Sequence, residues 1–209
     1  MTAPAMETRH STPSEAQTVR FMFDPACPWA WRTSQWIREA CKRRPIRVEW
    51  GLYSLEYANR KSTDERYRSS VRKSRVALRL LYLAREEGGE EAIDKLYLAL
   101  GRARHERGEQ LDRPAVLESA LTESGLDSSL LDRAQVETEL DDTLRSGYEA
   151  LEATGAFGVP TLYFGNDTTP YFGPVIDPVP ADEEAAKLWD NLSGIAQRPY
   201  FFELKRPRG

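Results

Sequence analysis

The residue with the clearest chemical potential is Cys27, which lies between an apolar segment and a helix-like segment opened by Pro28. The preceding Val19–Phe23 is β-branched and aromatic, which predicts a strand that ends at Asp24. A cysteine at the start of the next helix would lie beside unpaired backbone N–H groups, which stabilise a thiolate. We therefore expect Cys27 to be a reactive nucleophile, more acidic than a free thiol with its pKa of about 8.5. The alternative is a buried, inert cysteine that fills space.

The chain has one further cysteine, Cys41, on the same predicted helix as Cys27. At ~1.5 Å per residue their spacing corresponds to about 21 Å, far beyond the span of a disulfide. Two cysteines cannot form a disulfide framework, so we expect a reduced, cytoplasmic setting. Residues 1–17 are polar and lack the apolar stretch of a secretory signal, so we expect a flexible tail there.

The elements that must position Cys27 are expected to form a βαβ unit. Its helix begins at Pro28 and ends near Arg43, because Pro45 cannot continue it. Its second strand covers Ile46–Tyr53, and the crossover between the two strands should be right-handed.

The rest of the chain divides into a long helical region and a second part with strand character. The helical region contains a helix capped near Asp64, one over Glu90–Arg107, one opened by Asp112-Arg113-Pro114 with Asp112 as its cap, and two over Ser128–Ala134 and Glu139–Ala153. After it come a strand at Thr161–Phe164, a hairpin partner at Pro170–Gly173 and a helix at Pro180–Asn191. The order β-α-β, helices, β-β-α predicts an α/β fold with a helical insertion, because neither half closes a sheet alone.

Length and composition are those of a globular protein with a substantial core. The chain has 209 residues, of which 40% are hydrophobic, and it contains five Trp, nine Tyr and seven Phe. This composition excludes a wholly disordered chain. The 29 basic and 33 acidic residues give a net charge of −4, which disfavours a nucleic-acid partner. No apolar run approaches the ~20 residues of a membrane span, so we expect no membrane partner either.

Several segments carry a resemblance to a known family. They are Phe23–Trp31, Ser34-Gln35-Trp36, Gly158–Thr161 and Phe202–Arg206. With them the chain resembles the thioredoxin-fold, DsbA-like oxidoreductases, and it is more similar still to the mycothiol-dependent nitroreductase family. The resemblance implies a thioredoxin-like fold formed by residues 18–61 and 154–209, with residues 62–153 as an inserted all-helical subdomain.

The resemblance also implies an active site, with one departure from the family pattern. DsbA-like proteins begin their first helix with Cys-Pro-x-Cys, whereas this chain has Ala30 at the position of the second cysteine. Without that internal thiol, we expect monothiol chemistry in which a small thiol resolves the mixed disulfide. Pro160 would follow a cis peptide bond, although its position alone predicts a strand-start proline. The implied residues are catalytic Cys27 and Pro160, with Pro28, Trp29, Asn59, Tyr67, Val159 and Thr161 binding the thiol or substrate.

The leading hypothesis is a monothiol thiol–disulfide oxidoreductase or thiol-dependent reductase with Cys27 as its nucleophile. The thiol would be mycothiol, a largely uncharged sugar conjugate held by hydrogen bonds, and the second substrate a disulfide or an electrophile. One alternative resembles the kappa-class glutathione transferases and hydroxychromene-carboxylate isomerases, in which a residue at the Cys27 position activates a bound thiol. A third hypothesis is a non-catalytic binding protein. We expect no metal and no nucleotide, and a monomer or a homodimer.

Other chemically capable residues have simpler explanations. Trp31 and Trp36 have helical spacing and are expected in the core, whereas Trp29 should line the mouth of the site. His10 falls in the tail and His105 at an arginine-rich helix end, so neither indicates a metal cluster or a Cys–His dyad. A basic stripe predicts a solvated helix face with acidic partners, or else a surface for an anionic substrate. It consists of Arg68, Arg72, Arg75 and Arg79.

Overall fold

The structure is a computed structural model that describes residues 16–207. It opens with the predicted βαβ unit, in which β1 (Gln17–Phe23) and β2 (Ile46–Leu52) pair in parallel and α1 (Pro28–Cys41) connects them. The sequence predicts a tail over residues 1–17, and its residues 1–15 lie outside the described residues. Gln17 already belongs to β1, because its N–H group donates to the Pro45 carbonyl at 2.8 Å.

The sheet has the strand order β2-β1-β3-β4. β3 (Thr161–Phe164) has the predicted bounds and is antiparallel to β1, and β4 (Tyr171–Phe172) is a short antiparallel partner of β3. Thr161 pairs with Met22 near the end of β1. The chain segment that enters β3 therefore lies at the same edge of the sheet as the segment that leaves β1 and reaches Cys27.

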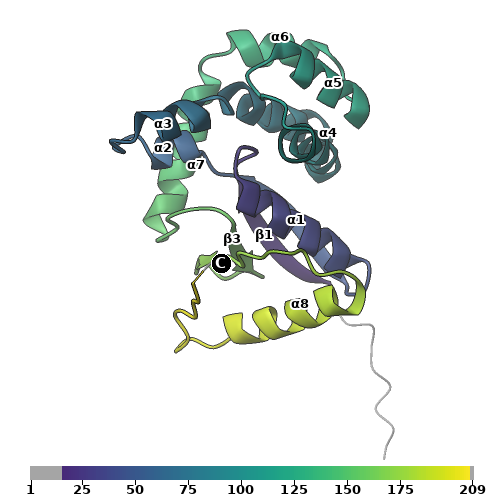
Figure 1. Cartoon of the computed structure of the whole chain (residues 1–209), viewed down its shortest axis with the longest axis vertical. Helices are drawn as coiled ribbons and strands as arrows, with labels where there is room; N and C mark the ends of the chain where they lie inside the picture. The colour runs from purple at the N-terminus through teal and green to yellow at the C-terminus, as the bar shows by residue number, and fades with distance from the viewer. Residues whose placement is uncertain (1–15, 208–209) are drawn as a thin grey trace, which may run out of the picture.

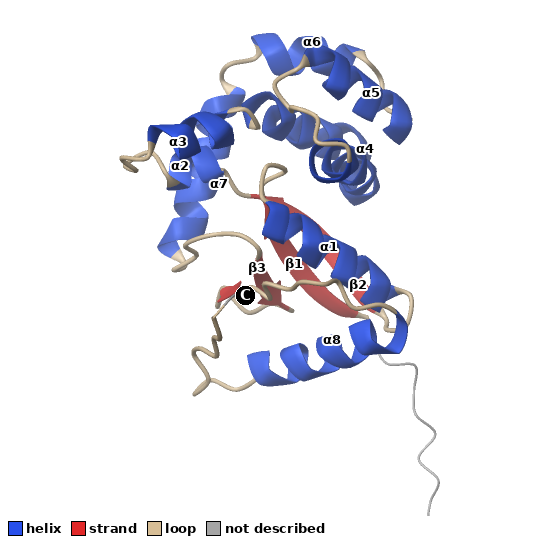
Figure 2. Cartoon of the chain, viewed as in Figure 1, coloured by secondary structure: helices blue, strands red, loops and turns tan. Residues whose placement is uncertain are grey.

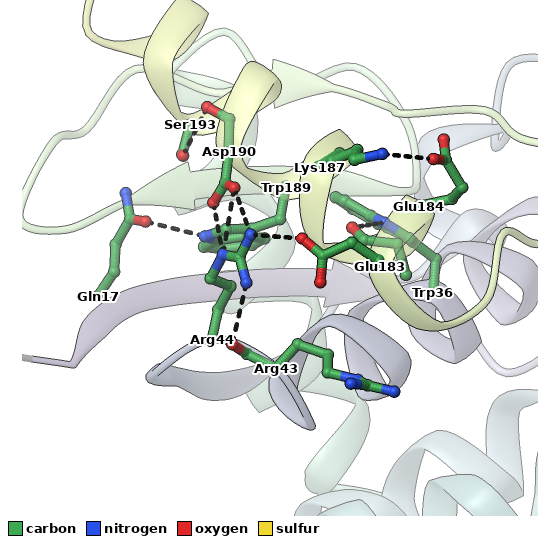
Figure 3. A network of polar contacts seen from close by, with 11 residues as sticks. Gln17, Trp36, Arg43, Arg44, Glu183, Glu184, Lys187, Trp189, Asp190 and Ser193 are labelled. Carbon is green, nitrogen blue, oxygen red and sulfur yellow. Dashed lines mark hydrogen bonds and ion pairs between the residues drawn. The ribbon is translucent and has the colours of Figure 1, made fainter.

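α8 (Asp182–Ala196) packs along α1 on one face of the sheet. The indole of Trp36 in α1 donates to the Ala185 carbonyl at 3.0 Å, and its ring lies 6.0 Å from that of Trp189. Trp189 in turn donates to the side chain of Gln17 at 3.0 Å (Figure 3). These contacts are possible because both tryptophans have a polar end that finds a partner while the ring stays buried.

Ion pairs add to this docking at the C-terminal end of α1. Arg44, in the turn after α1, contacts Asp190 at 2.8 Å and Glu183 at 3.2 Å (Figure 3). α8 extends five residues beyond the predicted end at Asn191, and its first turn carries the expected acidic residues. The region around α8 is thus anchored at the end of α1 that lies away from Cys27.

The helices between β2 and β3 form a separate group above the sheet, and the N-terminal end of α1 points toward them (Figures 1 and 2). They are α2 (Leu55–Ala58), α3 (Glu65–Arg72), α4 (Arg75–Gly101), a π-helical turn η1 (Arg102–Glu106), α5 (Pro114–Ser124), α6 (Ser129–Val136) and α7 (Leu140–Ala153). α2 precedes residue 62, and the division of the chain at residues 62 and 153 stays a prediction. None of the helices in residues 16–207 is long and apolar enough to cross a membrane.

Three local features differ from the predicted helices. The helix expected from Asp64 onward is interrupted at Ser74, whose hydroxyl donates to the Val71 carbonyl at 2.8 Å and competes with the helical pattern. α4 continues through the start predicted for the next helix, with a bend at Gly89, where φ is 64°. The predicted cap at Asp112 is wrong. Arg113 occupies that position because the residue before a helix-opening proline is pushed into an extended conformation.

An aromatic cluster joins the sheet, α1 and α4 close to the N-terminal end of α1. The ring of Tyr97 in α4 stacks on Phe23 of β1 at 3.7 Å and contacts Trp31 of α1 edge-on at 6.1 Å. Trp50 of β2 lies 5.6 Å from the same tyrosine ring. The burial predicted for Trp31 and Trp36 is therefore confirmed, and the N-terminal half of α1 is held rigidly against α4.

The basic stripe connects helices. Arg79 is only 5% exposed and forms a two-pronged contact with Asp141 of α7 at 2.7 and 2.6 Å. The other three arginines pair with carboxylates as well: Arg75 and Arg72 with Glu56, and Arg68 with Glu65. The expectation of acidic partners is met, but Arg79 is buried and does not belong to a solvated face.

Candidate active site

Cys27 is the N-cap residue of α1, where the sequence places it. Its backbone is extended, with φ of −82° and ψ of 114°, and Pro28 is the exposed first residue of the helix. The sulfur accepts a hydrogen bond from the Ala30 N–H group at 3.4 Å. A helix N–H directed at sulfur favours the thiolate over the thiol, as does the positive end of the helix dipole.

The segment entering β3 lies against this sulfur. The Val159–Pro160 peptide bond is cis, as the resemblance implies, and the Cys27 thiol donates to the Val159 carbonyl at 3.5 Å. That contact favours the protonated sulfur and so opposes the helix N–H group. Thr161 is fully buried and its hydroxyl donates to the Gly158 carbonyl at 2.7 Å. The backbone carbonyl of Val159 therefore contacts Cys27, and the hydroxyl of Thr161 stabilises the loop that contains Gly158 and Pro160.

Asn59 and Tyr67, which stand on different helices, are brought together near Cys27. Asn59 ends α2, where its amide donates to the Leu55 carbonyl at 2.8 Å. Tyr67 lies in the first turn of α3, and its N–H group donates to the capping carboxylate of Asp64 at 3.0 Å. Burial and the nearby Cys27 raise the pKa of the Tyr67 hydroxyl, and a hydrogen bond with Asn59 opposes this rise. The structure thus places Tyr67 near Cys27 and Asn59 in contact with Tyr67, and their binding roles stay predictions.

Aromatic residues lie close in sequence to both segments that meet at Cys27, and the place of Trp29 at the mouth of the site stays a prediction. Trp29 is half-buried in the first turn of α1, with the guanidinium of Arg32 at 5.1 Å from its ring centroid. On the β3 side, Phe157 and Phe172 stack at 5.0 Å although the first is 74% exposed, and Phe172 lies close to Gly158. Sequence reasoning missed the Phe157–Phe172 pair, because the two residues meet only when β4 folds back on β3.

Asp24 is a functional candidate that the sequence analysis treated only as the end of a strand. It is fully buried, and its two carboxylate oxygens accept hydrogen bonds from the N–H groups of Ala26 at 2.8 Å and Leu55 at 2.9 Å. Burial raises the pKa of this carboxyl to about 6, against the opposing effect of those hydrogen bonds and of Ser74. Asp24 ties the turn before Cys27 to α2. The sequence signal that could have identified Asp24 as a candidate is an acidic residue placed directly after a buried strand.

His105 is a further residue that sequence reasoning missed. Its imidazole Nε2 lies 2.9 Å from the carbonyl oxygen of Pro25, and its ring stacks on Trp31 with centroids 5.9 Å apart. Burial lowers the pKa of this histidine to about 4. The contact joins residues eighty positions apart in the chain, so no local signal could have revealed it. In residues 16–207, no group of three or more His, Cys, Asp or Glu side chains is arranged to hold a metal ion.

Comparison with known proteins places this chain in a family. The family model described as Rv2466c-like, mycothiol-dependent nitroreductase Rv2466c, matches residues 26–206. The chain belongs to this family. A curated relative, the uncharacterized protein Rv2286c of Mycobacterium tuberculosis (strain ATCC 25618 / H37Rv), is 34% identical over 198 residues, which cover 91% of this chain and 82% of the relative. Membership of the Rv2466c-like family makes the chain a thiol-dependent redox protein of the oxidoreductase class.

Solved structures identify the fold. The probable DsbA oxidoreductase SCO1869 from Streptomyces coelicolor superposes with a TM-score of 0.60 at 17% identity, covering 91% of this chain and 94% of that one. A 2-hydroxychromene-2-carboxylate isomerase superposes with a TM-score of 0.61 at 15% identity, covering 85% and 94%. The predicted DsbA-like thioredoxin fold with added helices is confirmed. At these identities the likeness concerns the fold alone.

Proposed function

We propose that this chain is a monothiol oxidoreductase in which Cys27 exchanges disulfides with a small thiol, most consistent with mycothiol. The observation that carries the proposal is the sulfur of Cys27 at the N-cap of α1, within hydrogen-bond distance of the Ala30 N–H group. The N–H group of Ala30 stabilises the charge of the nucleophile. The side chain of Ala30 is a methyl group, so no second thiol stands at this position to resolve a mixed disulfide.

The exchange proceeds in two displacements. In the first, the Cys27 thiolate attacks one sulfur of a mixed disulfide, forms a new S–S bond to it, and releases the other sulfur as a thiolate. In the second, Cys27 leaves as a thiolate when a second small-thiol molecule attacks that new bond. One disulfide and one thiol enter each cycle, and one disulfide and one thiol leave it, so no electrons are gained or lost overall. The Ala30 N–H group stabilises Cys27 both as attacking and as leaving thiolate.

The polar groups around Cys27 suit a thiol attached to sugars. Asn59 offers an amide, Tyr67, a residue that is 42% exposed, offers a hydroxyl, and Val159 offers its backbone. These groups form hydrogen bonds and carry no charge at neutral pH, as recognition of an uncharged sugar conjugate requires. The arginines of the basic stripe are engaged with carboxylates, and Arg79 is buried, which favours hydrogen bonding over charge pairing as the mode of recognition.

Mass spectrometry of the protein after incubation with oxidised mycothiol tests the proposal. We expect one mycothiol adduct on Cys27, removed by an excess of the reduced thiol, and the same adduct in the matched control Cys41→Ser. Cys27→Ser should form none. An adduct located on Cys41, or an adduct that excess thiol leaves in place, would contradict the proposed cycle.

The second candidate is a thiol transferase or isomerase, favoured by the absence of a second motif cysteine and by the fold shared with the 2-hydroxychromene-2-carboxylate isomerase. In that case Cys27 would stabilise the thiolate of a bound thiol without forming a bond to it. Incubation with mycothiol and an electrophile such as a chlorodinitrobenzene would then yield a thioether product with no protein adduct at any time. The two mechanisms are therefore separated by whether Cys27 becomes covalently modified.

A further inference from the structure

The turn Asp24–Cys27 is held from two sides. On one side, the buried carboxylate of Asp24 accepts from Ala26 and Leu55, and the N–H group of Cys27 donates to the Asp24 carbonyl at 2.9 Å. On the other side, the π-helical turn η1 brings His105 to the Pro25 carbonyl at 2.9 Å. Pro25 lies before the N-cap, so its carbonyl takes no part in the hydrogen bonding of α1. The imidazole supplies a donor for this buried acceptor.

The chemistry of the contact fixes the state of the imidazole. A backbone carbonyl only accepts, so the Nε2 atom of His105 must carry the hydrogen, and in the neutral ring Nδ1 is then an acceptor. Burial lowers the pKa of this histidine to about 4, the hydrogen bond with Pro25 opposes that effect, and the cations Arg104 and Arg32 add to it. His105 is therefore neutral, with one defined tautomer, throughout the range in which thiols react.

Packing leaves His105 little freedom to move. Its ring lies 5.9 Å from that of Trp31, at an interplanar angle of 19°. A Cβ atom added at Gly101, one turn earlier, would lie 2.1 Å from the same indole. The start of η1 therefore rests directly on Trp31, which allows the helix to approach the turn closely. π-Helical turns of this kind occur frequently at functional sites.

We propose that His105 is a positioning residue for Cys27: its Nε2–H group holds the Pro25 carbonyl, and through it the turn that keeps the Cys27 sulfur on the N–H group of Ala30. The proposal rests on Cys27 being the reactive thiol and goes beyond the proposed function, because it concerns how the thiolate is formed and not which thiol it meets. His105 touches neither the sulfur nor a substrate in this role.

Two substitutions separate the hydrogen bond from the packing. Gln can place its amide nitrogen where Nε2 of histidine lies, so His105→Gln keeps the donor. His105→Phe keeps a flat ring on Trp31 and removes the donor. Both are made in a Cys41→Ser background, so that the ultraviolet absorbance of the thiolate reports Cys27 alone. The measured quantity is the pH midpoint of thiolate formation, which packing alone would not move.

We expect His105→Phe to lower the acid dissociation constant of Cys27 by about fivefold, the effect of one net hydrogen bond, and His105→Gln to stay within about twofold of the parent. An unchanged midpoint in a folded His105→Phe variant would overturn the proposal, and so would equal shifts in both variants. If neither variant folds, the imidazole nitrogen shifts of the parent decide by NMR: an Nε2–H tautomer supports the proposal, and an Nδ1–H tautomer overturns it.

These outcomes are independent of the proposed function. The midpoints are compared between variants without mycothiol, so a failure of mycothiol to react leaves the result on His105 standing. Conversely, an unchanged midpoint in His105→Phe leaves the adduct experiment on Cys27 untouched.

Discussion

The two cysteines of this chain occupy opposite ends of one helix, and the groups that surround their sulfurs differ. Cys27 caps the N-terminus of α1 and accepts a hydrogen bond from a helix N–H group. Cys41 is the last residue of α1, and its thiol lies 3.9 Å from the Ile46 carbonyl, to which it donates. Burial raises the pKa of Cys41 to about 11, a nearby Asp94 adds to this rise, and Arg38 opposes it.

Accessibility alone would rank the two thiols the other way. Cys27 is 6% exposed, whereas Cys41 is only partly buried. The helix supplies N–H groups and positive potential at one end and carbonyl groups and negative potential at the other. The comparison shows that two effects act on these sulfurs: the helix N-terminus favours a thiolate at Cys27, and burial raises the pKa of Cys41.

The largest difference between the two ends should appear in catalysis. Cys27→Ser removes the nucleophile and should reduce thiol exchange with oxidised mycothiol by about a hundredfold or more, since serine is a poor nucleophile without an adjacent base. Cys41→Ser is the matched control and should retain nearly full activity. Equal losses in the two variants would assign Cys41 a chemical role that its distance from the site denies.

The order of alkylation tests the role of helix direction. With a pKa of about 11, Cys41 should react with iodoacetamide at pH 8 about a hundredfold more slowly than a free thiol, because so little thiolate is present. Cys27 should therefore be modified first, as read from peptide mass spectra at increasing times. Labelling of Cys41 ahead of Cys27 would show that exposure outweighs electrostatics at this helix.

Restoring the second cysteine should add a function to the N-terminal end. Ala30 follows Cys27 by three positions, and its N–H group lies 3.4 Å from the sulfur, so Ala30→Cys places a thiol within reach of a disulfide. The variant should reduce insulin with dithiothreitol about tenfold faster than the parent, because its mixed disulfide resolves internally. Thiol counting before and after reduction monitors the bridge. A folded variant that never closes it would contradict the assigned geometry.

The smallest predicted effect concerns the response to pH of two groups beside the Cys27 end of α1, Asp24 and His105. Burial raises the pKa of Asp24 to about 6, so the folded state binds an extra proton there and the free energy of unfolding falls between pH 4 and 6. Burial lowers the pKa of His105 to about 4, so the free energy of unfolding rises as the pH increases from 4 to 6.5. The two slopes largely cancel in the parent protein.

His105→Gln should leave the Asp24 slope uncompensated. Urea unfolding from pH 4 to 6.5 should then show a free energy of unfolding that falls, relative to the parent, by up to about 1.4 kcal/mol per pH unit. Asp24→Asn serves as the opposite control, with a relative slope of the other sign. Parallel pH profiles for the parent and both variants would mean that neither group titrates as its burial requires.

Local signals in the sequence were sufficient for one half of the site. The strand Val19–Phe23, the cysteine that follows it and the proline at the next position specify the N-cap of α1, and Asp64 specifies the start of α3. The cis bond before Pro160 required the family resemblance, because nothing in the local composition distinguishes it from a strand-start proline.

The other half of the site depends on tertiary contacts that local patterns do not encode. Asp24 reads as a strand terminator, and only the fold shows its carboxylate bridging Ala26 and Leu55. His105 stands among arginines at a helix end, a setting typical of a solvated surface, yet α4 and η1 carry it to Pro25. Helix boundaries failed for a related reason, since Ser74 and Gly89 change the chain direction through conformations that apolar spacing does not report.

The π-helical turn Arg102–Glu106 makes the contact at Pro25 depend on a residue count as well as on residue identity. Successive residues of an α-helix are separated by about 100° around the axis. Deleting one residue between Gly101 and His105 would therefore change the direction in which the imidazole leaves the helix, away from the Pro25 carbonyl. A related chain could carry the same cysteine motif and the same histidine yet lack the contact, if its helix were one residue shorter. In this family, a single-residue gap in an alignment can thus mark the loss of the hydrogen bond between this histidine and the turn before the cysteine, even where both residues are aligned.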